Sequence, residues 1–438
     1  MSPLEVGIIG IAVVIVLLFS GMPVSFVMFL VGFIGFTVLT SLEAGLQMVA
    51  KQVNNAFTLY AFSAIPTFVL MGYLASESGI SERLFKTANA WVGQIRGGLA
   101  IAAIVASAAF GAICGSSAAT VATIGIAAYP SMKEHKYDPG MSTACIAAGS
   151  MLGTMIPPSL IFVIYGIITE NSIAQLFVAG FLPGILCVLV LSGTVYLMVL
   201  RKPSLGPAGQ PASWRTRWTM LGGGTYQTII IFVTVLGALT LGLCTPTEAG
   251  AVGVLAVLLV GAIGKKGISW KGINNALGQT IQTSAFIILC LAGVGVLSPF
   301  LAISGIPREM GAFLVGLDVP PVITMIGILL IYFASGFIID PLPFVILTMP
   351  IFYPIVLSLG YDPIWFGVII ILVCGLGSIT PPVAMFCYVI SGITGVPAGT
   401  VFRGIWPFVV ALCVATAILV AFPQIATFLP NFLMPTGR

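Results

Sequence analysis

One group of residues in this chain recurs at a fixed separation, and this internal repeat strongly limits the folds that the chain can adopt. The matching pairs are 224 residues apart: Tyr137-Asp138-Pro139 and Tyr361-Asp362-Pro363, Gly153 and Gly377, Pro157-Pro158 and Pro381-Pro382, Gly180 and Gly404, Pro183 and Pro407, and Pro130 and Pro354. Composition alone does not produce so many matches at one offset. The chain is therefore interpreted as a tandem duplication, with halves near residues 1–200 and 223–438.

The composition indicates whether this duplicated fold lies in water or in a membrane. Of the 438 residues, 59% are hydrophobic and 6% are charged, whereas about a quarter of the residues of a soluble domain carry charge. The chain is therefore expected to be an integral membrane protein. Its single histidine, His135, excludes His-clustered metal sites and Ser-His or Cys-His catalytic pairs. No enzyme activity is expected, and the net charge of +4 gives no indication of nucleic-acid binding.

Apolar stretches of spanning length predict transmembrane helices. They lie near residues 6–20, 23–40, 61–75, 174–200, 223–243, 246–263, 283–300 and 398–422. Their hydrophobic residues do not alternate, which argues against the strands of a membrane β-barrel. The predicted fold class is an all-α polytopic membrane protein.

Four further apolar stretches are interrupted near the middle. Residues 97–130 and 320–356 are interrupted by Gly115-Ser116-Ser117 and by residues 336–341, and residues 138–169 and 362–394 by residues 153–158 and 377–382. The first pair is predicted to form re-entrant helical hairpins. The second pair is predicted to form discontinuous helices, because a double proline removes two backbone donors and disfavours helix before it. Paired discontinuous helices within a duplication are typical of secondary transporters.

The distribution of Lys and Arg predicts that the two repeats have inverted topology. With the linker after residue 200 in the cytoplasm, 13 of the 16 basic residues lie on the cytoplasmic side and three lie outside. The three outside residues are Lys51, Arg308 and Arg438. The positive-inside rule supports this arrangement, which places both termini outside.

Two moderately polar segments, residues 42–56 and 268–281, are interpreted as interfacial arm helices that lie along the membrane surface. The alternative is that each is an ordinary polar loop.

The interrupted helices also predict where ligands bind. Carbonyl oxygens at broken helix ends, together with Ser and Thr hydroxyls, suit a small hard cation such as Na⁺, and half-helix N-termini suit an anion. The first site would combine residues 115–117 with residues 153–156, and the second would combine Gly336 and Asp340 with residues 377–380. Close helix packing through small residues is the alternative for these clusters. For Asp340 the alternative is a cap on the helix that begins at Pro341.

At these motifs the sequence resembles a known family. Residues 115–120 (GSSAAT), 153–159 (GTMIPPS), 245–249 (TPTEA) and 377–382 (GSITPP) resemble the large membrane subunit of TRAP (tripartite ATP-independent periplasmic) transporters, and the resemblance covers essentially the whole chain. It implies an ion-transporter-superfamily fold with an elevator mechanism and a Na⁺ gradient as the energy source. It also implies a separate small four-helix membrane subunit, a periplasmic substrate-binding protein and a location in the bacterial inner membrane.

The resemblance also implies site residues. The Na⁺ sites would map onto Ser116, Ser117, Gly153, Ile156, Gly336, Gly377 and Thr380. The organic anion would be bound around Ser116, Ser117, Pro158, Asp340 and Pro382. No Walker-type phosphate loop occurs in the chain, so ATP hydrolysis by this subunit is excluded.

These predictions divide the chain into a fixed scaffold and a mobile transport domain. The scaffold would comprise residues 1–96 with the first arm, 184–222 with the cytoplasmic linker, 223–319 with the second arm, and the C-terminal helix in 408–438; the transport domain would comprise residues 97–183 and 320–407. The expected function is Na⁺-coupled import of a small organic anion in the membrane. A stand-alone carrier that needs no binding protein is the first alternative, and a channel or structural subunit is the second.

Overall fold

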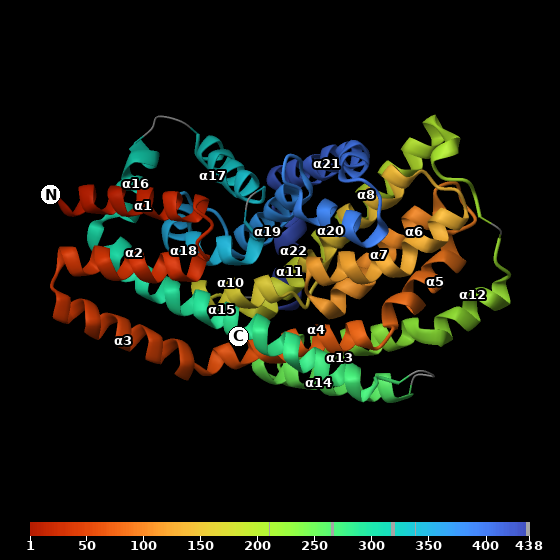
Figure 1. Cartoon of the computed structure of the whole chain (residues 1–438), viewed down its shortest axis with the longest axis horizontal. Coiled ribbons are helices and arrows are strands. Elements are labelled where there is room, and N and C mark those ends of the chain that lie inside the picture. The colour runs from red at the N-terminus through yellow and green to blue at the C-terminus, as the bar shows by residue number, and fades with distance from the viewer. Residues whose placement is uncertain (210, 264–266, 317–319, 338, 435–438) are drawn as a thin grey trace.

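The computed structural model describes residues 1–209, 211–263, 267–316, 320–337 and 339–434, and all the regular structure in these ranges is helical (Figure 1). The helices of the first half are α1 (Pro3–Phe19), α2 (Val24–Leu39), α3 (Leu42–Thr58), α4 (Ala64–Glu77), α5 (Ile80–Val92), α6 (Gly98–Cys114), α7 (Ser117–Glu134), α8 (Pro139–Ser150), α9 (Leu152–Met155), α10 (Leu160–Thr169) and α11 (Ile173–Arg201). Side-chain caps start several of them; Ser2, for example, forms a reciprocal capping box with Glu5.

The linker between the halves contains a short 3₁₀ helix (Pro203–Leu205), helix α12 (Trp214–Met220) and the start of a π-helical turn (Leu221–Thr225). The helices of the second half are α13 (Tyr226–Thr240), α14 (Pro246–Ile263), α15 (Trp270–Ser304), α16 (Ile306–Gly316), α17 (Pro321–Ser335), α18 (Pro341–Ser358), α19 (Pro363–Ile379), α20 (Met385–Thr394), α21 (Ala398–Ala421) and α22 (Gln424–Leu433). Helices α1, α2, α3 and α16 lie at one end of the long axis, α5 and α12 lie at the other, and α10, α11 and α19 lie between them (Figure 1).

The helix lengths agree with a protein that crosses a membrane several times. Within the described residues, five helices or broken helices are long and apolar enough to span a bilayer, and α3 with α4 would form a sixth span that bends by 50°. The predicted spans near residues 6–20 and 23–40 are helical, but α1 and α2 have 17 and 16 residues. The chain is an all-helical, multi-span membrane protein.

One predicted boundary is wrong. The polar segment 268–281 and the span 283–300 belong to the single 35-residue helix α15 rather than to an arm and a separate span. The hydroxyl of Thr280 donates to the carbonyl of Ala276 at 2.6 Å, so this polar side chain is satisfied within the helix and does not end it. The other predicted arm, residues 42–56, is helix α3, with Ser41 as its N-cap; the polar-loop alternative is therefore wrong for both segments.

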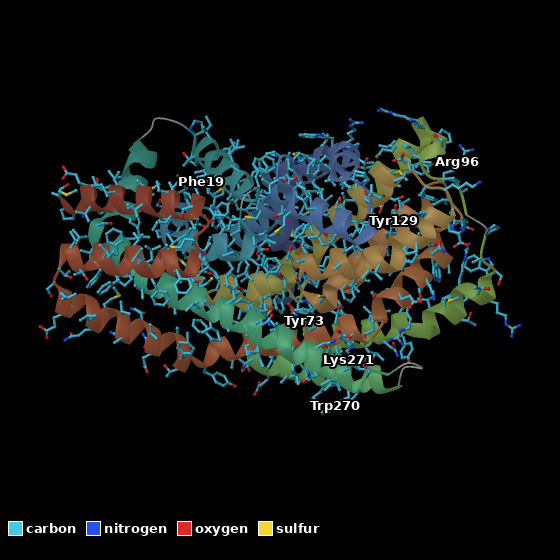
Figure 2. All side chains as sticks on the ribbon, in the orientation of Figure 1. Phe19, Tyr73, Arg96, Tyr129, Trp270 and Lys271 are labelled. Atoms are coloured by element: carbon cyan, nitrogen blue, oxygen red, sulfur yellow. The ribbon has the colours of Figure 1, made fainter. Side chains whose placement is uncertain are left out.

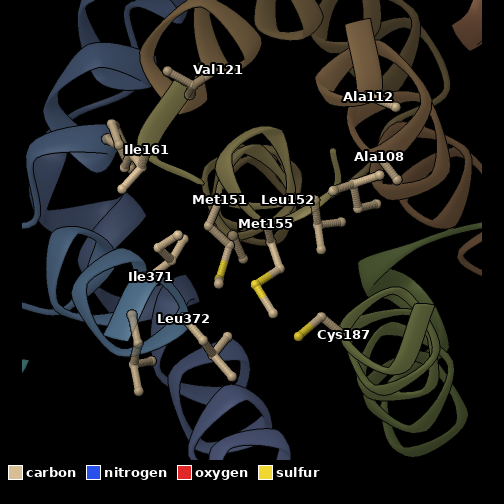
Figure 3. Packing of buried hydrophobic residues seen from close by; sticks show 14 of the residues in the cluster. Ala108, Ala112, Val121, Met151, Leu152, Met155, Ile161, Cys187, Ile371 and Leu372 are labelled. Atoms are coloured by element: carbon tan, nitrogen blue, oxygen red, sulfur yellow. The ribbon is translucent and has the colours of Figure 1, made fainter. Parts of the chain in front are cut away.

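The hydrophobic core is built around the short helix α9 and the end of α8. Met151, Leu152 and Met155 are buried there among side chains of α6, α11 and α19 (Figure 3). Cys187 contributes to the core from α11, and Leu372 from α19 (Figure 3). Elements from both halves of the chain thus enclose one broken helix, which fixes the position of the break between α9 and α10.

Candidate functional site

Helices α6 and α7 are joined by a turn that we call tip 1 (residues 114–117). Only two residues separate the end of α6 from the start of α7. Gly115 has φ +63°, a left-handed conformation that glycine adopts without steric cost. Ser116 is extended and caps α7, its Oγ accepting a hydrogen bond from the amide of Ala119 at 3.4 Å. The break predicted at these residues is confirmed.

The chain leaves the helical conformation between α9 and α10, in a segment that we call break 1 (residues 153–159). Helix α9 ends just before the double proline. The amide of Ile156 still donates to the carbonyl of Leu152 at 2.8 Å, but Ile156 itself is extended, with φ −86° and ψ 124°. The next two residues, Pro157 and Pro158, are joined by a cis peptide bond and have no N–H to donate. Helix α10 therefore starts anew at Leu160.

Tip 1 and break 1 lie against each other. The hydroxyls of Ser117 and Thr154 are hydrogen-bonded at 3.1 Å. A Cβ atom placed on Gly153 would lie 2.6 Å from Thr120 Oγ1 and 2.9 Å from Ser116 O. The structure thus brings together Ser116, Ser117 and Gly153 of the predicted first site.

Ile156 and Pro158 of break 1 contact different elements. The side chain of Ile156 packs against Gly184 on α11. The carbonyl of Pro158 packs against tip 1, 2.8 Å from where a Cβ atom of Gly115 would be. Both residues are buried.

In the second half, the turn between α17 and α18 is tip 2 (residues 335–340, with Ile338 outside the described residues), and the interruption before α20 is break 2 (residues 377–384). Gly336 and Gly377 pack backbone to backbone. Thr380 occupies the position equivalent to Ile156 and has a similar extended backbone, with φ −91° and ψ 128°. Its hydroxyl donates to the carbonyl of Leu376 at 2.6 Å.

Asp340 is the N-cap of α18. Its Oδ1 accepts a hydrogen bond from the amide of Leu342 at 3.0 Å, and the residue is exposed. The capping role considered for Asp340 is therefore confirmed. Because Oδ2 makes no hydrogen bond within the described residues, the cap leaves one carboxylate oxygen available to a ligand.

The two sites differ in what covers them. Pro158 is buried, whereas Pro382 at the equivalent position is exposed. A cavity of about 50 Å³ lies between tip 1, Pro158 and helices α4 and α15. Its far wall includes Tyr73 and Thr283, whose hydroxyls are hydrogen-bonded at 2.9 Å; Figure 2 shows Tyr73 on α4.

Two hydroxyl residues at the first site were missed by sequence reasoning, whereas Thr154, which contacts Ser117, lies within the predicted range 153–156. Thr120 lies against Gly153 of break 1. Ser159 is 1% exposed, and its Oγ has no hydrogen-bond partner among the described residues. Ser159 ends the motif at residues 153–159, and Thr120 follows Ser116 by one helical turn, a spacing that could have identified it.

The site as a whole offers oxygen atoms and few charges. No group of three His, Cys, Asp or Glu residues with metal-binding geometry occurs within the described part of the chain. The groups that meet at tip 1 and break 1 are hydroxyls and backbone carbonyls at helix ends. The oxygens of both groups can coordinate a hard cation, and the hydroxyls can also donate hydrogen bonds to an anion.

A family model described as the DctM component of tripartite ATP-independent periplasmic transporters matches residues 11–425. The chain is 32% identical to the sialic acid TRAP transporter large permease protein SiaM of Vibrio cholerae, over 96% of this chain and 98% of that protein. It is also 32% identical to the C4-dicarboxylate TRAP transporter large permease protein DctM of Pseudomonas aeruginosa, over 91% and 92% of the two chains.

A solved structure resembles the fold. The YdaH transporter of Alcanivorax borkumensis superimposes with a TM-score of 0.57 at 14% identity, over 87% of this chain and 89% of that one. At this identity the likeness concerns the fold alone.

Proposed function

The chain belongs to the DctM component family of tripartite ATP-independent periplasmic transporters, and from this premise we propose that it is the large membrane subunit of a Na⁺-coupled importer of a small organic anion. As a member of a transporter permease family it is not an enzyme. The observation that carries the proposal is the contact of a hairpin tip with a helix break in each half of the chain.

Each tip and break pair would bind one Na⁺. Hydroxyl and carbonyl oxygens are hard ligands and suit this ion, and broken helix ends supply carbonyls that have no intrahelical partner. The proposed ligands are Ser116, Ser117, Gly153 and Ile156 in the first half, and Gly336, Gly377 and Thr380 in the second. The contact of Ser117 with Thr154 supports the first assignment.

The anion would bind between the two pairs. Ser116, Ser117, Pro158, Asp340 and Pro382 are proposed to surround it, with half-helix N-termini directed at its negative charge. Two relatives are named for sialic acid and C4-dicarboxylate transport, and both compounds are carboxylates. The proposed substrate class is a carboxylate or a sulfonate, since either presents the negative charge that half-helix N-termini suit.

The repeats are proposed to be inverted and to assemble a transport domain that moves as an elevator against the scaffold. Two contacts between the halves support movement as one unit. The hydroxyl of Tyr165 donates to the carbonyl of Pro363 at 2.6 Å, and Asn171 Nδ2 donates to the hydroxyl of Tyr353 at 2.8 Å. These residues lie in the proposed transport segments of the first and second half.

The chain would work with two partners, as the word tripartite in the family description indicates. We propose a small four-helix membrane subunit on a separate chain and a periplasmic binding protein that delivers the anion. The complex would lie in the bacterial inner membrane, with both termini of this chain in the periplasm.

Uptake by proteoliposomes tests the proposal. The chain is reconstituted with its small subunit, and the binding protein loaded with a radiolabelled carboxylate is added outside. Uptake should require an inward Na⁺ gradient and should fall to background with K⁺ in place of Na⁺. Uptake that is equal in K⁺ would overturn Na⁺ coupling, and uptake by the purified chain alone would favour the stand-alone carrier.

A further inference from the structure

The cavity of about 50 Å³ lies where the hairpin of the first half meets two helices of the proposed scaffold. Tip 1 and break 1 form one side of it through Gly115, Ser116 and Pro158, and α4 and α15 form the other side. The contact beside the cavity is tight, because a Cβ atom on Gly72 of α4 would lie 2.5 Å from the carbonyl oxygen of Cys114. The anion site proposed above includes no residue of α4 or α15.

Three of the side chains that line this cavity carry a hydroxyl, and they are Tyr73, Ser116 and Thr283. Apart from Cys114, the other lining residues are apolar or glycine. A hydroxyl among apolar groups is costly unless it has a hydrogen-bond partner. The partners of these three hydroxyls therefore indicate what the cavity can hold.

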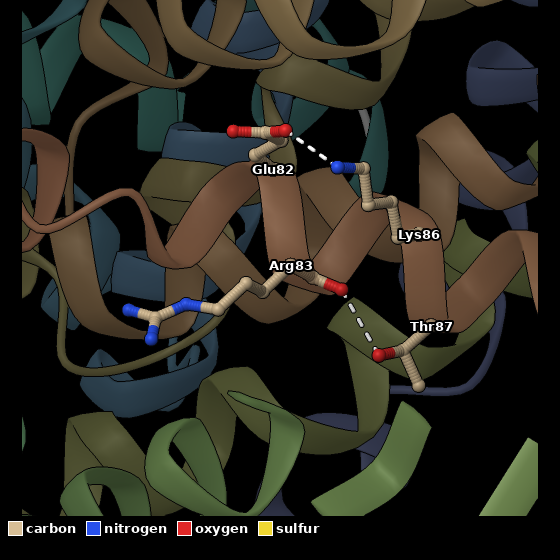
Figure 4. A network of polar contacts seen from close by, with 4 residues as sticks. All are labelled: Glu82, Arg83, Lys86 and Thr87. Carbon is tan, nitrogen blue, oxygen red and sulfur yellow. Dashed lines mark hydrogen bonds and ion pairs between the residues drawn. The ribbon is translucent and has the colours of Figure 1, made fainter. Parts of the chain in front are cut away.

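Thr283 differs from two other helical threonines in the way its hydroxyl is bonded. The hydroxyl of Thr280, one turn earlier on α15, donates to a carbonyl of the preceding turn at 2.6 Å. The hydroxyl of Thr87 on α5 donates in the same way to the carbonyl of Arg83 at 2.9 Å (Figure 4). Such a bond satisfies a hydroxyl within its own helix. Thr283 makes no bond of this kind and instead contacts Tyr73 on another helix.

The three hydroxyls leave two protons without an acceptor among the described residues. Tyr73 Oη and Thr283 Oγ1 lie 2.9 Å apart, and one of them donates to the other, which leaves the second proton of the pair free. Ser116 Oγ accepts from the amide of Ala119, and its own proton has no acceptor in the described part of the chain. The free groups around the cavity are therefore donors.

The start of α7 also favours an anion in the cavity. Ser116 is the N-cap of α7, Ala119 lies in its first turn, and both line the cavity. The N–H groups of a first helical turn have no intrahelical acceptors and carry the positive end of the helix dipole. No Asp or Glu is among the described residues that line the cavity. A ligand that satisfies these donors must supply acceptor oxygens.

The volume of the cavity limits the ligand to a small group. One water molecule needs about 10–15 Å³, so a cavity of about 50 Å³ admits roughly three or four atoms of that size. A carboxylate has three heavy atoms, and two of them are acceptor oxygens. The cavity therefore fits the head group of an organic acid and not the whole molecule.

We propose that this cavity binds the carboxylate of the transported anion, with Tyr73 and Thr283 as substrate-contacting residues contributed by the scaffold. The inference rests on the proposed function. The free proton of the Tyr73–Thr283 pair is donated to one carboxylate oxygen, and Ser116 donates to the other. Because tip 1 belongs to the proposed transport domain, whereas α4 and α15 belong to the scaffold, these contacts exist only while tip 1 lies against α4. Movement of tip 1 removes them and weakens the binding of the anion, which favours its release.

The test measures binding to the full chain, purified in a mild detergent with NaCl. Thermal unfolding is followed while acetate, pyruvate, succinate or N-acetylneuraminate is added, and the primary amide of an acid that binds serves as its neutral counterpart. At least one carboxylate should stabilise the wild type more than its amide does. Tyr73→Phe and Thr283→Val should each raise the concentration of that carboxylate needed for half-maximal stabilisation about ten-fold, the usual effect of losing one hydrogen bond to a charged group.

Three further variants distinguish a ligand contact from a structural role. Thr283→Ser keeps the hydroxyl and should bind the carboxylate like the wild type. Thr280→Val and Thr87→Val remove hydroxyls that are satisfied within their own helices and do not line the cavity, so they should leave the affinity unchanged. The Na⁺ concentration needed for half-maximal stabilisation without carboxylate should also stay the same in Tyr73→Phe and Thr283→Val, whereas a distorted tip 1 would change it.

Three results would overturn the proposal. One is carboxylate affinity in both Tyr73→Phe and Thr283→Val equal to that of the wild type. Another is the absence of stabilisation of the wild type by all four carboxylates, and the last is equal stabilisation by a carboxylate and its amide. Failure of the proposed function gives a different result: uptake that is equal in K⁺ removes Na⁺ coupling, but the effects of the two substitutions on carboxylate affinity would remain.

Discussion

Gly336 on tip 2 and Gly377 on break 2 touch backbone to backbone, and a Cβ atom on either residue would lie 2.8 Å from the Cα of the other. In the first half, a Cβ atom on Gly111 of α6 would meet the Cα of Gly153 in break 1, whereas a Cβ atom on Gly153 would meet Thr120 Oγ1 and the carbonyl of Ser116. In both halves, therefore, the hairpin and the broken helix pack closely at a glycine. In the second half no side chain separates Gly336 from Gly377.

Adding a methyl group at this contact should disrupt the second site. Gly377→Ala would place a Cβ atom against the carbonyl of Phe333 and the Cα of Gly336. Because both are backbone atoms, the helices must separate, at a cost of about 1–3 kcal/mol. We expect a lower thermal unfolding temperature and loss of Na⁺-dependent uptake in proteoliposomes.

Gly327→Ala is the matched control on α17. A Cβ atom on Gly327 would have no heavy atom within 4 Å, and alanine favours a helix over glycine by about 1 kcal/mol. This variant should transport normally and unfold at the same or a higher temperature. Equal effects of the two substitutions would show that the Gly336–Gly377 contact has no special role.

A double-mutant cycle can measure the coupling between tip 1 and break 1. Ser117→Ala and Thr154→Val each remove one hydroxyl of the 3.1 Å hydrogen bond. Their effects on stability should be non-additive by about 0.5–1.5 kcal/mol, the usual net contribution of one hydrogen bond. If Na⁺ binds here, the coupling measured by thermal unfolding should be larger in NaCl than in KCl.

Thr143→Val provides the comparison for this cycle. The hydroxyl of Thr143 bonds to Pro139 O within its own helix at 2.7 Å and makes no contact with Ser117. Its effect should therefore add to that of Ser117→Ala within about 0.5 kcal/mol. An additive result for the Ser117 and Thr154 pair in both salts would argue against a Na⁺ site at tip 1.

The helix breaks could be predicted from the sequence because their causes are local. Pro157-Pro158 lacks two donors, and Gly115 permits a left-handed turn that other residues resist. These effects act within a few residues and need no tertiary information. The fixed offset of 224 residues then paired the two breaks, and the equivalent backbone angles of Ile156 and Thr380 agree with that pairing.

The contacts across the site could not be predicted in the same way. Tyr73 and Thr283 are hydrogen-bonded although they lie 210 residues apart, and no periodicity in the sequence relates them. Ser159 carried a signal in its motif, but it is buried beside Gly115 of tip 1, a contact between distant segments. The polar residues of segment 268–281 predicted a helix boundary that α15 does not have, because the hydroxyl of Thr280 is satisfied within the helix.

The second site can be tested without changing its backbone. Asp340→Asn preserves the N-cap, since Asn and Asp cap equally well, and removes the charge. If the carboxylate serves an ion or the substrate, uptake should fall about ten-fold while the unfolding temperature stays within about 2 °C, consistent with an intact cap. Unchanged uptake would leave Asp340 with the capping role alone.

Thr380→Val should reduce the apparent Na⁺ affinity in the same assay, because it removes the hydroxyl that now bonds to Leu376 O. Thr380→Ser retains that hydroxyl and should behave like the wild type. Equal Na⁺ dependence of the Val and Ser variants would contradict the assignment of Thr380 as a ligand.

Movement of the hairpin against the scaffold can be tested by cross-linking. Ser76 on α4 and Thr123 on α7 have their hydroxyls 3.0 Å apart, so cysteines at both positions should form a disulfide on mild oxidation. If α7 moves with an elevator domain while α4 stays fixed, oxidation should abolish uptake and dithiothreitol should restore it. The background carries Cys413→Ser, because Cys413 is exposed. Full uptake with the disulfide formed would rule out this relative motion.

One phenol joins the linker between the halves to the start of α6. The hydroxyl of Tyr137 donates to Pro207 O at 2.8 Å and accepts from the amide of Leu99 at 3.2 Å. Burial raises the pKa of this hydroxyl, which therefore keeps its proton in the folded protein. Tyr137→Phe leaves two backbone groups without a partner, and we expect a loss of about 1–3 kcal/mol in unfolding free energy.

Tyr361, at the equivalent position of the second half, supplies the control. Its ring stacks on Trp365 at 5.3 Å, and its hydroxyl makes no hydrogen bond within the described residues, so Tyr361→Phe should be nearly neutral. Because the folded state holds the Tyr137 proton more tightly than the unfolded chain does, its contribution is complete below the ordinary tyrosine pKa of about 10 and declines above it. Unfolding followed from pH 8 to pH 11 should therefore show a difference between wild type and Tyr137→Phe that shrinks at the alkaline end. A difference that grows with pH would contradict this account of the hydrogen bonds to the linker.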